Sequence, residues 1–188
     1  MPRKSEGSAA IQRASTRQWV LKPQDLAVAF KLVSLRDQRL QYRDLAKQMY
    51  LSQFEVHAAA KRLVAARLAR EDETGVWPIL KVLHPFVIYG AAYAYPAVRT
   101  DITIGFPTAH GASPLKTQVL FADQLSPVWP HPDGPVRGPG ILPLYEKLPL
   151  AAQEDPLMYE LLALFDALRI GQARERELAG QYLEERMK

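Results

Sequence analysis

The sequence predicts a mainly α-helical fold, and three observations lead to that expectation. Apolar residues recur at helical spacing in residues 23–66 and again in residues 156–187. Runs with strand-like composition are short and few. Between the two helical regions, residues 96–149 hold 10 of the 15 prolines, a density that disfavours long helices and central strands. We therefore expect N-terminal helices, an irregular proline-rich segment and C-terminal helices.

The composition is typical of an ordered protein without cysteine chemistry. Of the 188 residues, 48% are hydrophobic and 23% are charged, which excludes wholesale disorder. The absence of cysteine excludes disulfides, thiolate metal sites and a cysteine nucleophile. The longest apolar run, residues 86–95, is about half of the roughly 20 residues that a membrane-spanning helix needs. The basic N-terminus lacks the apolar stretch of a secretory signal. We expect a cytoplasmic protein that contacts no membrane.

Charge is distributed unequally along the chain. Residues 1–70 hold 14 Lys and Arg against 5 Asp and Glu, a net charge of +9. Residues 71–188 hold 10 Lys and Arg against 15 Asp and Glu, a net charge of −5. A basic segment favours a polyanionic partner, and an acidic remainder favours a different role. Residues 1–18 show no helical or strand period, so we expect them to form a mobile basic arm.

Three helices are expected after this arm. The first spans residues 23–36 and has proline at its first position, where the fixed φ angle suits a helix. The second spans residues 42–49. The third spans residues 53–66 and follows a capping box, in which Ser52 and Glu55 each bind the other's backbone amide. This capping box is the strongest local signal in the chain.

A short hairpin is expected next, over residues 68–77, because a strand-like run on each side flanks an acidic turn that ends in glycine. A buried helix should follow, with His84 as its N-cap, Pro85 as its first residue and Pro96 at its end. Its aromatic side chains are expected in the core rather than around a ligand pocket. They are Phe86, Tyr89, Tyr93 and Tyr95.

The last part of the chain is expected to contain one strand, over residues 101–106, and two helices. The first of these helices begins at Pro156, which Asp155 precedes as N-cap, and ends at Gly171. The second covers residues 172–187. These two helices carry more apolar side chains than the short irregular segment before them can cover, so we expect the helices to form a dimer interface. These side chains are Leu161, Leu164, Phe165, Leu168 and Leu178.

Three helices, a turn between the second and third, and a hairpin follow each other in the order of a winged helix-turn-helix. Residues 51–63, with the sequence LSQFEVHAAAKRL, resemble the recognition helix of MarR-like bacterial regulators. The resemblance covers residues 20–80, about a third of the chain. It implies a bacterial transcriptional regulator whose third helix enters the major groove of double-stranded DNA.

Two features depart from that pattern. Tyr50 stands in the turn where such proteins usually have glycine, which tolerates a left-handed backbone at no steric cost. The tip of the hairpin would carry Glu71, Asp72 and Glu73, and phosphates repel carboxylates. Either this wing is too short to touch DNA, or the unit does not dock in the usual manner.

The side chains expected to contact DNA share one property: they point away from the predicted core on the second and third helices. Gln53 can bind an adenine edge with two hydrogen bonds, and Phe54 can contact a thymine methyl group. His57 can bind a base or a phosphate, whereas lysine and arginine suit phosphates. The complete set is Ser52, Gln53, Phe54, His57, Lys61, Arg62, Arg43 and Lys47.

The sequence gives no support for an enzyme. Its four histidines lack the helical spacing of a metal site. We find no phosphate-binding glycine loop and no nucleophile elbow. We therefore expect no catalytic residue, no cofactor and no metal.

The prediction is a mobile arm at residues 1–18, a DNA-binding domain at residues 19–95, and a dimerisation or partner-binding segment at residues 96–188. The function expected is sequence-specific DNA binding by a homodimeric transcriptional regulator. In the alternative, residues 96–188 bind a partner protein, as in an antitoxin, and DNA binding serves autoregulation. A third possibility, which the acidic wing favours, is a structural protein that uses the fold for assembly alone.

Overall fold

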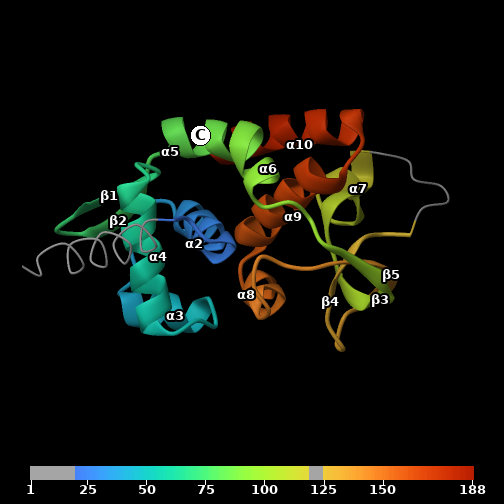
Figure 1. Ribbon diagram of the computed structural model, residues 1–188, viewed down its shortest axis with the longest axis horizontal. Helices are drawn as coiled ribbons and strands as arrows, with labels where there is room; N and C mark the ends of the chain where they lie inside the picture. The colour runs from blue at the N-terminus through green and yellow to red at the C-terminus, as the bar shows by residue number, and fades with distance from the viewer. Residues whose placement is uncertain (1–19, 119–124) are drawn as a thin grey trace, which may run out of the picture.

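The computed structural model describes residues 20–118 and 125–188 (Figure 1). The basic arm predicted at residues 1–18 lies outside the described residues. Three helices and a hairpin occupy one end of the molecule, and a small barrel occupies the other end. The C-terminal helices lie between them and extend along the upper edge in this view. Within residues 20–118 and 125–188, each helix is too short or too polar to cross a membrane.

The N-terminal unit has its elements within about two residues of the predicted positions. Helices α2 (Pro23–Ser34), α3 (Tyr42–Gln48) and α4 (Gln53–Ala65) pack around a shared apolar centre. An antiparallel hairpin of β1 (Ala69–Asp72) and β2 (Gly75–Pro78) follows. These helices form as predicted because local signals coincide with packing, including the proline at the first position of α2 and the cap before α4.

The next helix differs from its prediction. It begins five residues earlier, as α5 (Leu80–Phe86), and has Ile79 rather than His84 at its N-cap. Pro85 therefore lies inside the helix, which continues as the π-helical turn η1 (Val87–Ala91) and the short α6 (Ala92–Ala94). A proline removes one backbone donor from the ladder, and wider π-helical turns are one way in which a helix absorbs such a disturbance.

This helix also exposes part of its aromatic face. Tyr89 is 76% exposed and Tyr93 is 81% exposed, so the prediction that these two side chains lie in the core is wrong. Phe86 and Tyr95 are partly buried against the core, as expected. Apolar composition alone did not reveal which face of the helix has a partner within the chain.

The proline-rich segment contains more β-structure than expected, so the fold is mixed α and β rather than mainly α. Strands β3 (Arg99–Pro107), β4 (Val128–Pro130) and β5 (Val136–Ile141) close into a small barrel. Strand β3 pairs antiparallel with both others, and a parallel bridge between β4 and β5 completes the ring. Short helical pieces, η2 (Ala109–Gly111) and α7 (Leu115–Gln118), follow β3.

Glycine makes this tight closure feasible. A Cβ atom on Gly105 would collide with the backbone carbonyl of Trp129, and one on Gly138 would collide with the carbonyl of Ser126. The prolines that end β3 and β4 lie where the ladder stops and a missing donor costs little. Proline density therefore excluded long helices correctly, but it did not exclude short strands.

The C-terminal helices are α8 (Leu148–Gln153), α9 (Pro156–Ile170) and α10 (Ala173–Arg186). Helix α9 begins as predicted, because the Asp155 carboxylate accepts a hydrogen bond from the Met158 amide at 3.0 Å. It packs against α2, with the rings of Phe30 and Phe165 5.9 Å apart. One apolar core thus runs through both of the segments that were predicted to divide near residue 95.

Buried ion pairs fix the helices within this core. The Asp25 carboxylate, which is fully buried, accepts two hydrogen bonds of 2.6 Å from the guanidinium of Arg62. It also accepts a hydrogen bond from the Lys22 amide at 2.8 Å, which caps α2. Arg62 is only 7% exposed, and its pKa is raised by the hydrogen bonds from its side chain to Asp25. Helices α2 and α4 are therefore joined by a bidentate charged contact.

Arg62→Met should lower the free energy of unfolding by about 3–5 kcal/mol, because it leaves the Asp25 carboxylate buried without its charged partner. The measurement is urea denaturation followed by far-ultraviolet circular dichroism. Arg43→Met is the matched control, since the Arg43 side chain is exposed, and it should change stability by no more than about 0.5 kcal/mol. Equal stability of the two variants would contradict a structural role for Arg62.

Candidate nucleic-acid interface

The turn between α3 and α4 has the left-handed residue that the sequence pattern requires. Tyr50 has φ +51° and follows Met49, the C-cap residue of α3. The Leu51 amide donates to the Ala46 carbonyl and the Tyr50 amide donates to the Lys47 carbonyl, each at 3.1 Å. This pair of bonds is the Schellman motif, in which glycine usually takes the left-handed position. Tyrosine adopts it at a cost of about 1 kcal/mol.

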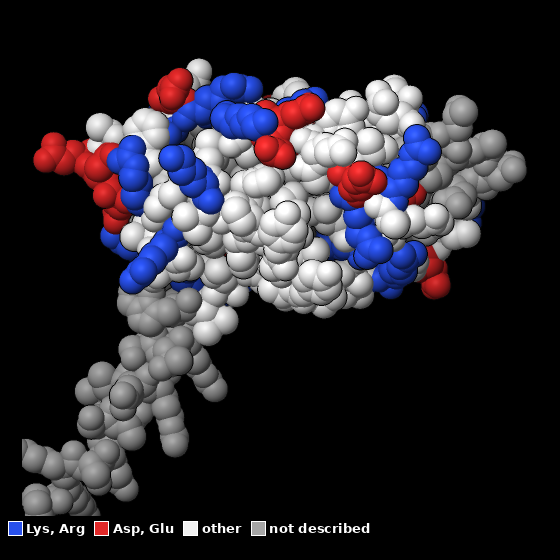
Figure 2. Space-filling view, turned by 90° about the horizontal axis from the view of Figure 1, so that it is seen from above, with Lys and Arg blue, Asp and Glu red and all other residues white. Residues whose placement is uncertain are grey.

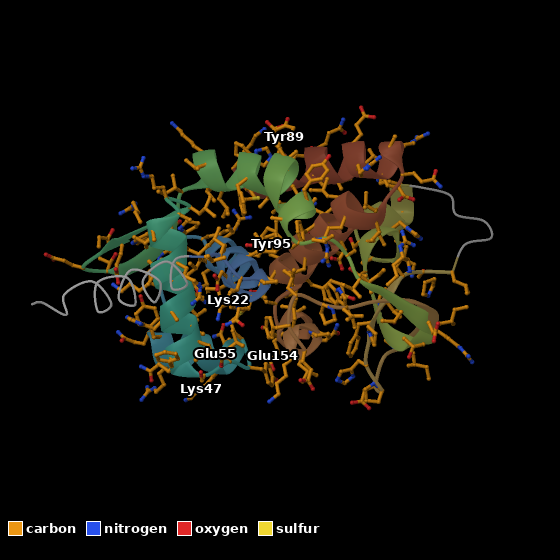
Figure 3. The ribbon with its side chains drawn as sticks, viewed as in Figure 1. Lys22, Lys47, Glu55, Tyr89, Tyr95 and Glu154 are labelled. Atoms are coloured by element: carbon orange, nitrogen blue, oxygen red, sulfur yellow. The ribbon has the colours of Figure 1, made fainter. Side chains whose placement is uncertain are left out.

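Two contacts from the C-terminal half hold this turn. The hydroxyl of Tyr145 donates to the Met49 carbonyl at 2.7 Å, and the Tyr50 hydroxyl binds the Glu154 carboxylate. Burial raises the pKa of Tyr145, so its hydroxyl stays a donor at neutral pH. Figure 3 shows Glu154 beside the end of the three-helix unit, where it contacts Tyr50. The strained residue of the turn is thus supported from a distant part of the chain.

The capping box predicted before α4 is confirmed. The Glu55 amide donates to the Ser52 hydroxyl at 3.2 Å, and the Ser52 amide donates to the Glu55 carboxylate at 2.9 Å. The Ser52 hydroxyl also donates to that carboxylate at 2.7 Å, and hydrogen bonds from Ser52 lower the pKa of Glu55. Ser52 therefore fixes where α4 begins.

The first turns of α4 present an uncovered face. Gln53 and His57 are exposed, and the Phe54 side chain is 80% exposed, which is unusual for an aromatic residue. The His57 ring packs edge-on against Tyr42 of α3, with centroids 5.1 Å apart. An open hollow of about 370 Å³ lies beside this face, between the beginnings of α3 and α4. Its lining includes Gln41 and Tyr42, which the sequence analysis did not place among the expected DNA contacts.

The cations of α3 border the same face. Arg43 and Lys47 have side chains 72% exposed, and both lie close to Asp44, at 3.4 Å and 3.8 Å respectively. Figure 3 shows Lys47 extending outward from the lower end of the three-helix unit. These side chains are accessible to a large ligand and are only partly neutralised by one neighbouring carboxylate.

Lys61 is less available than the sequence suggested. Its ammonium group donates to the Glu71 carboxylate of β1 at 2.7 Å, and the Tyr42 hydroxyl reaches the same carboxylate at 3.4 Å. The hydrogen bond from Lys61 is the largest cause of the lowered pKa of Glu71. Burial and the proximity of Glu71 raise the pKa of Tyr42 to about 12. The pair joins the end of α4 to the hairpin.

The remaining acids of the hairpin are used differently. Asp72 accepts hydrogen bonds from the Thr74 hydroxyl, the Thr74 amide and the Trp77 indole, and it pairs with Arg70. These contacts, first among them the Thr74 hydroxyl, hold the pKa of Asp72 well below its usual range. Glu73 is exposed at the tip. Two of the three predicted acids therefore stabilise the hairpin through their side-chain contacts, although all three are exposed.

Arg62 does not belong to this surface, and its prediction as a phosphate contact requires correction. It lies next to Lys61 in sequence, but a helix turns by about 100° per residue, so the two side chains point in different directions. Arg62 points inward to Asp25. Of the predicted contacts, Ser52, Gln53, Phe54, His57, Lys61, Arg43 and Lys47 lie on the outer face of α3 and α4.

Comparisons with protein-family models, with curated proteins and with solved structures found no match to this chain. The similarity to MarR-like regulators therefore stays a prediction from the residues.

Ser52→Ala should lower the free energy of unfolding by about 1 kcal/mol, because it removes the side-chain acceptor of the first turn of α4. Ser52→Gly removes the same hydroxyl but should cost only a few tenths of a kcal/mol, since glycine is itself tolerated at N-caps. Thermal unfolding of both variants beside the wild type measures the difference. Stability of Ser52→Ala equal to that of the wild type would show that the hydroxyl does not act as a cap.

Proposed function

We propose that this chain is a sequence-specific double-stranded DNA-binding protein of the winged helix-turn-helix type, and that it regulates transcription in bacteria. The observation that carries the proposal is the uncovered start of α4, where Gln53, Phe54 and His57 project from a capped helix. Exposed Arg43 and Lys47 of α3 border it. Amide, aromatic and imidazole groups suit base edges, and the flanking cations suit the phosphate backbone.

The size of α4 suits this role. Its 13 residues span about 20 Å at 1.5 Å per residue, and the major groove of B-DNA is about 12 Å wide and accepts one helix. The N-terminal turn of a groove-bound helix meets the bases, and Gln53 and Phe54 are the first two residues of α4. The partial positive charge at this end of the helix adds to the attraction for phosphate.

The hairpin has a restricted part in this proposal. Glu73 at its tip would be repelled by phosphates, so the tip stays away from the backbone. Glu71 neutralises Lys61, which removes one cation from the phosphate-binding set. The proposed contact surface is therefore α3 and the beginning of α4, without an inserted wing.

The experiment that tests the proposal is duplex binding as a function of salt. With a handful of phosphate contacts, affinity should fall by about 10² or more between 50 and 200 mM salt. Duplexes selected from a random pool supply the preferred sequence, and scrambled duplexes supply the reference. Absence of binding at 50 mM salt, or an affinity that does not respond to salt, would refute DNA binding.

Variants separate sequence recognition from backbone attraction. Gln53→Ala should cost about 1–3 kcal/mol on the selected duplex and little on scrambled DNA, because it removes a base contact. Lys47→Ala should weaken both complexes alike and lower the salt slope by about one. Lys61→Ala should lower the slope by less than Lys47→Ala, since Glu71 already pairs with Lys61.

The control for this series is Arg137→Ala, which removes an exposed arginine from β5 in the barrel. It should bind both duplexes as the wild type does. If Gln53→Ala remains folded and discriminates between the two duplexes as well as the wild type does, Gln53 makes no base contact and the orientation proposed for α4 is wrong.

Self-association is the second component of the proposal, because helix-turn-helix proteins commonly bind two half-sites as dimers. The apolar side chains expected to form the interface do not serve it: Leu161, Leu164 and Phe165 are fully buried in the monomer, Leu168 is 8% exposed, and Leu178 is partly buried against the core. They pack against the chain's own helices. The interface must therefore use another surface.

The exposed tyrosines of the α5–α6 segment supply that surface. Tyr89 and Tyr93 border a groove of about 540 Å³ between this segment and α10, and Arg176 and Glu177 line its rim. Figure 3 shows Tyr89 on the upper side of the molecule, beside α10, and Figure 2 shows uncharged atoms over much of the middle of this side. A rim with one cation and one anion is complementary to itself under two-fold symmetry, so the proposed occupant is a second copy.

Tyr89→Asp combined with Tyr93→Asp should convert the homodimer into a monomer, because carboxylates would replace the apolar contacts of the interface. Light scattering coupled to gel filtration measures the mass. Ile102→Asp, at an exposed apolar position on β3, is the control and should remain dimeric. A wild-type mass of 21.2 kDa at tens of micromolar protein would show that this surface does not join two copies.

A partner-binding function, as in an antitoxin, is the second candidate, and the barrel favours it. Ile102 and Ile104 of β3 are 52% and 49% exposed, and alternate residues of a strand lie on one face. They form a small apolar strip within residues 96–188. Co-purification with the product of a neighbouring gene, lost in Ile102→Asp but retained in the tyrosine variant, would favour this candidate.

A further inference from the structure

A hollow of about 260 Å³ lies behind the hairpin and is lined by charge of mostly one sign. Its cationic lining residues are Arg36 and Arg39, after α2, and Arg186 and Lys188, at the end of α10. Asp37 is the single acid in the lining, and Trp77 forms one wall. Leu32 and Val33 of α2, with Pro78 and Leu80, complete the surface. Two segments far apart in sequence thus contribute cations to the same hollow.

Arg39 is held in place without a carboxylate partner. Its guanidinium stacks on the Trp77 ring, with Cζ 3.1 Å from the ring centroid, and donates to the Arg36 carbonyl at 2.6 Å. Within residues 20–118 and 125–188, its Nε is buried and has no hydrogen-bond acceptor. Burial lowers the pKa of Arg39, and Asp37 offsets this only in part. A buried donor without an acceptor is costly, so the Arg39 guanidinium beside the hollow is not fully satisfied by the described part of the chain.

The other cations differ in how far they are neutralised. Arg186 pairs with Glu160 at 2.8 Å, and Lys188 pairs with Glu184 at 3.5 Å. Among the described residues, neither Arg36 nor Arg39 has a carboxylate within ion-pair distance. The uncompensated charge of the hollow is therefore concentrated on these two arginines.

The hollow lies on the opposite face of the hairpin from Lys61. Residues paired directly across antiparallel strands share a face, and Trp77 pairs with Arg70 whereas Glu71 pairs with Val76. Since successive residues alternate between faces, Trp77 and Glu71 point to opposite sides. The cations around Trp77 therefore do not belong to the surface proposed for DNA.

We propose that this hollow is a binding site for a small phosphate-bearing anion. Two guanidinium groups match the oxygens of phosphate in geometry and charge, and they are more weakly hydrated than an ammonium group. The volume suits an inorganic phosphate or the phosphate group of a small metabolite rather than a drug-sized ligand. A bound phosphate would contact both the segment after α2 and the end of α10.

The site is tested by titrating the full chain with inorganic phosphate at constant ionic strength. Binding is detected by calorimetry and by tryptophan fluorescence. Saturable binding is expected, with a change in fluorescence because Arg39 lies on Trp77. Arg36→Gln and Arg39→Gln should each weaken phosphate binding at least about tenfold, which is about 1.4 kcal/mol. Arg137→Gln, which removes an equal charge from β5, should leave it unchanged.

Two outcomes would overturn the proposal. One is the absence of saturable binding at millimolar phosphate. The other is equal affinity of wild type, Arg36→Gln and Arg39→Gln, with melting curves confirming that each is folded.

Scrambled duplex DNA in place of phosphate distinguishes the source of the phosphate group: Arg36→Gln should bind it as the wild type does. If Arg36→Gln loses affinity for the duplex but binds inorganic phosphate as the wild type does, the hollow takes the phosphate of DNA instead. Since phosphate is titrated without DNA, failure of DNA binding leaves this test intact.

Discussion

The buried contact between Asp25 and Arg62 is the constraint on which the candidate interface depends. Asp25 caps α2 through the Lys22 amide and binds Arg62 of α4 through both carboxylate oxygens. Two parallel hydrogen bonds from a planar guanidinium restrict rotation as well as distance. The contact therefore sets which face of α4 turns inward, and Gln53, Phe54 and His57 are exposed as a consequence.

A second buried carboxylate, that of Asp166, joins elements of the fold at the other end of the core. Asp166 of α9 accepts hydrogen bonds of 2.7 Å from the Thr108 hydroxyl and from the Trp129 indole, and it pairs with Arg169. Arg169 in turn donates to the Tyr95 carbonyl at 3.3 Å. Each polar group in this cluster has a partner, which is the condition for polar groups to stabilise an interior rather than destabilise it. The small barrel is attached to α9 in this way.

Sequence alone predicted those elements that local chemistry determines. The capping box of Ser52 and the N-cap of Asp155 were predictable because each places its donor and acceptor within four residues. The barrel was not, since its closure depends on pairing between residues of β3 and β5 that lie 31 to 42 positions apart. The inward direction of Arg62 was likewise not predictable, because its partner Asp25 is 37 residues earlier in the chain. A charged residue next to Lys61 is expected to be exposed. The exposure of Tyr89 and Tyr93 was not predictable for the same reason, since helices distant in sequence determine which side chains are buried.

The support of the α3–α4 turn by Tyr145 and Glu154 has a consequence for how the protein is made. Synthesis proceeds from the N-terminus, and local structure in a nascent chain precedes contacts between distant segments. Helix α4 ends at residue 65, yet the partners of Met49 and Tyr50 lie 96 and 104 residues after them in the chain. The apolar face of α2 also lacks its packing partner Phe165 until α9 is synthesised. A chain released early would contain the whole predicted DNA-binding sequence without the contacts that hold its turn, so the ribosome must finish nearly the entire protein before the interface takes its final shape.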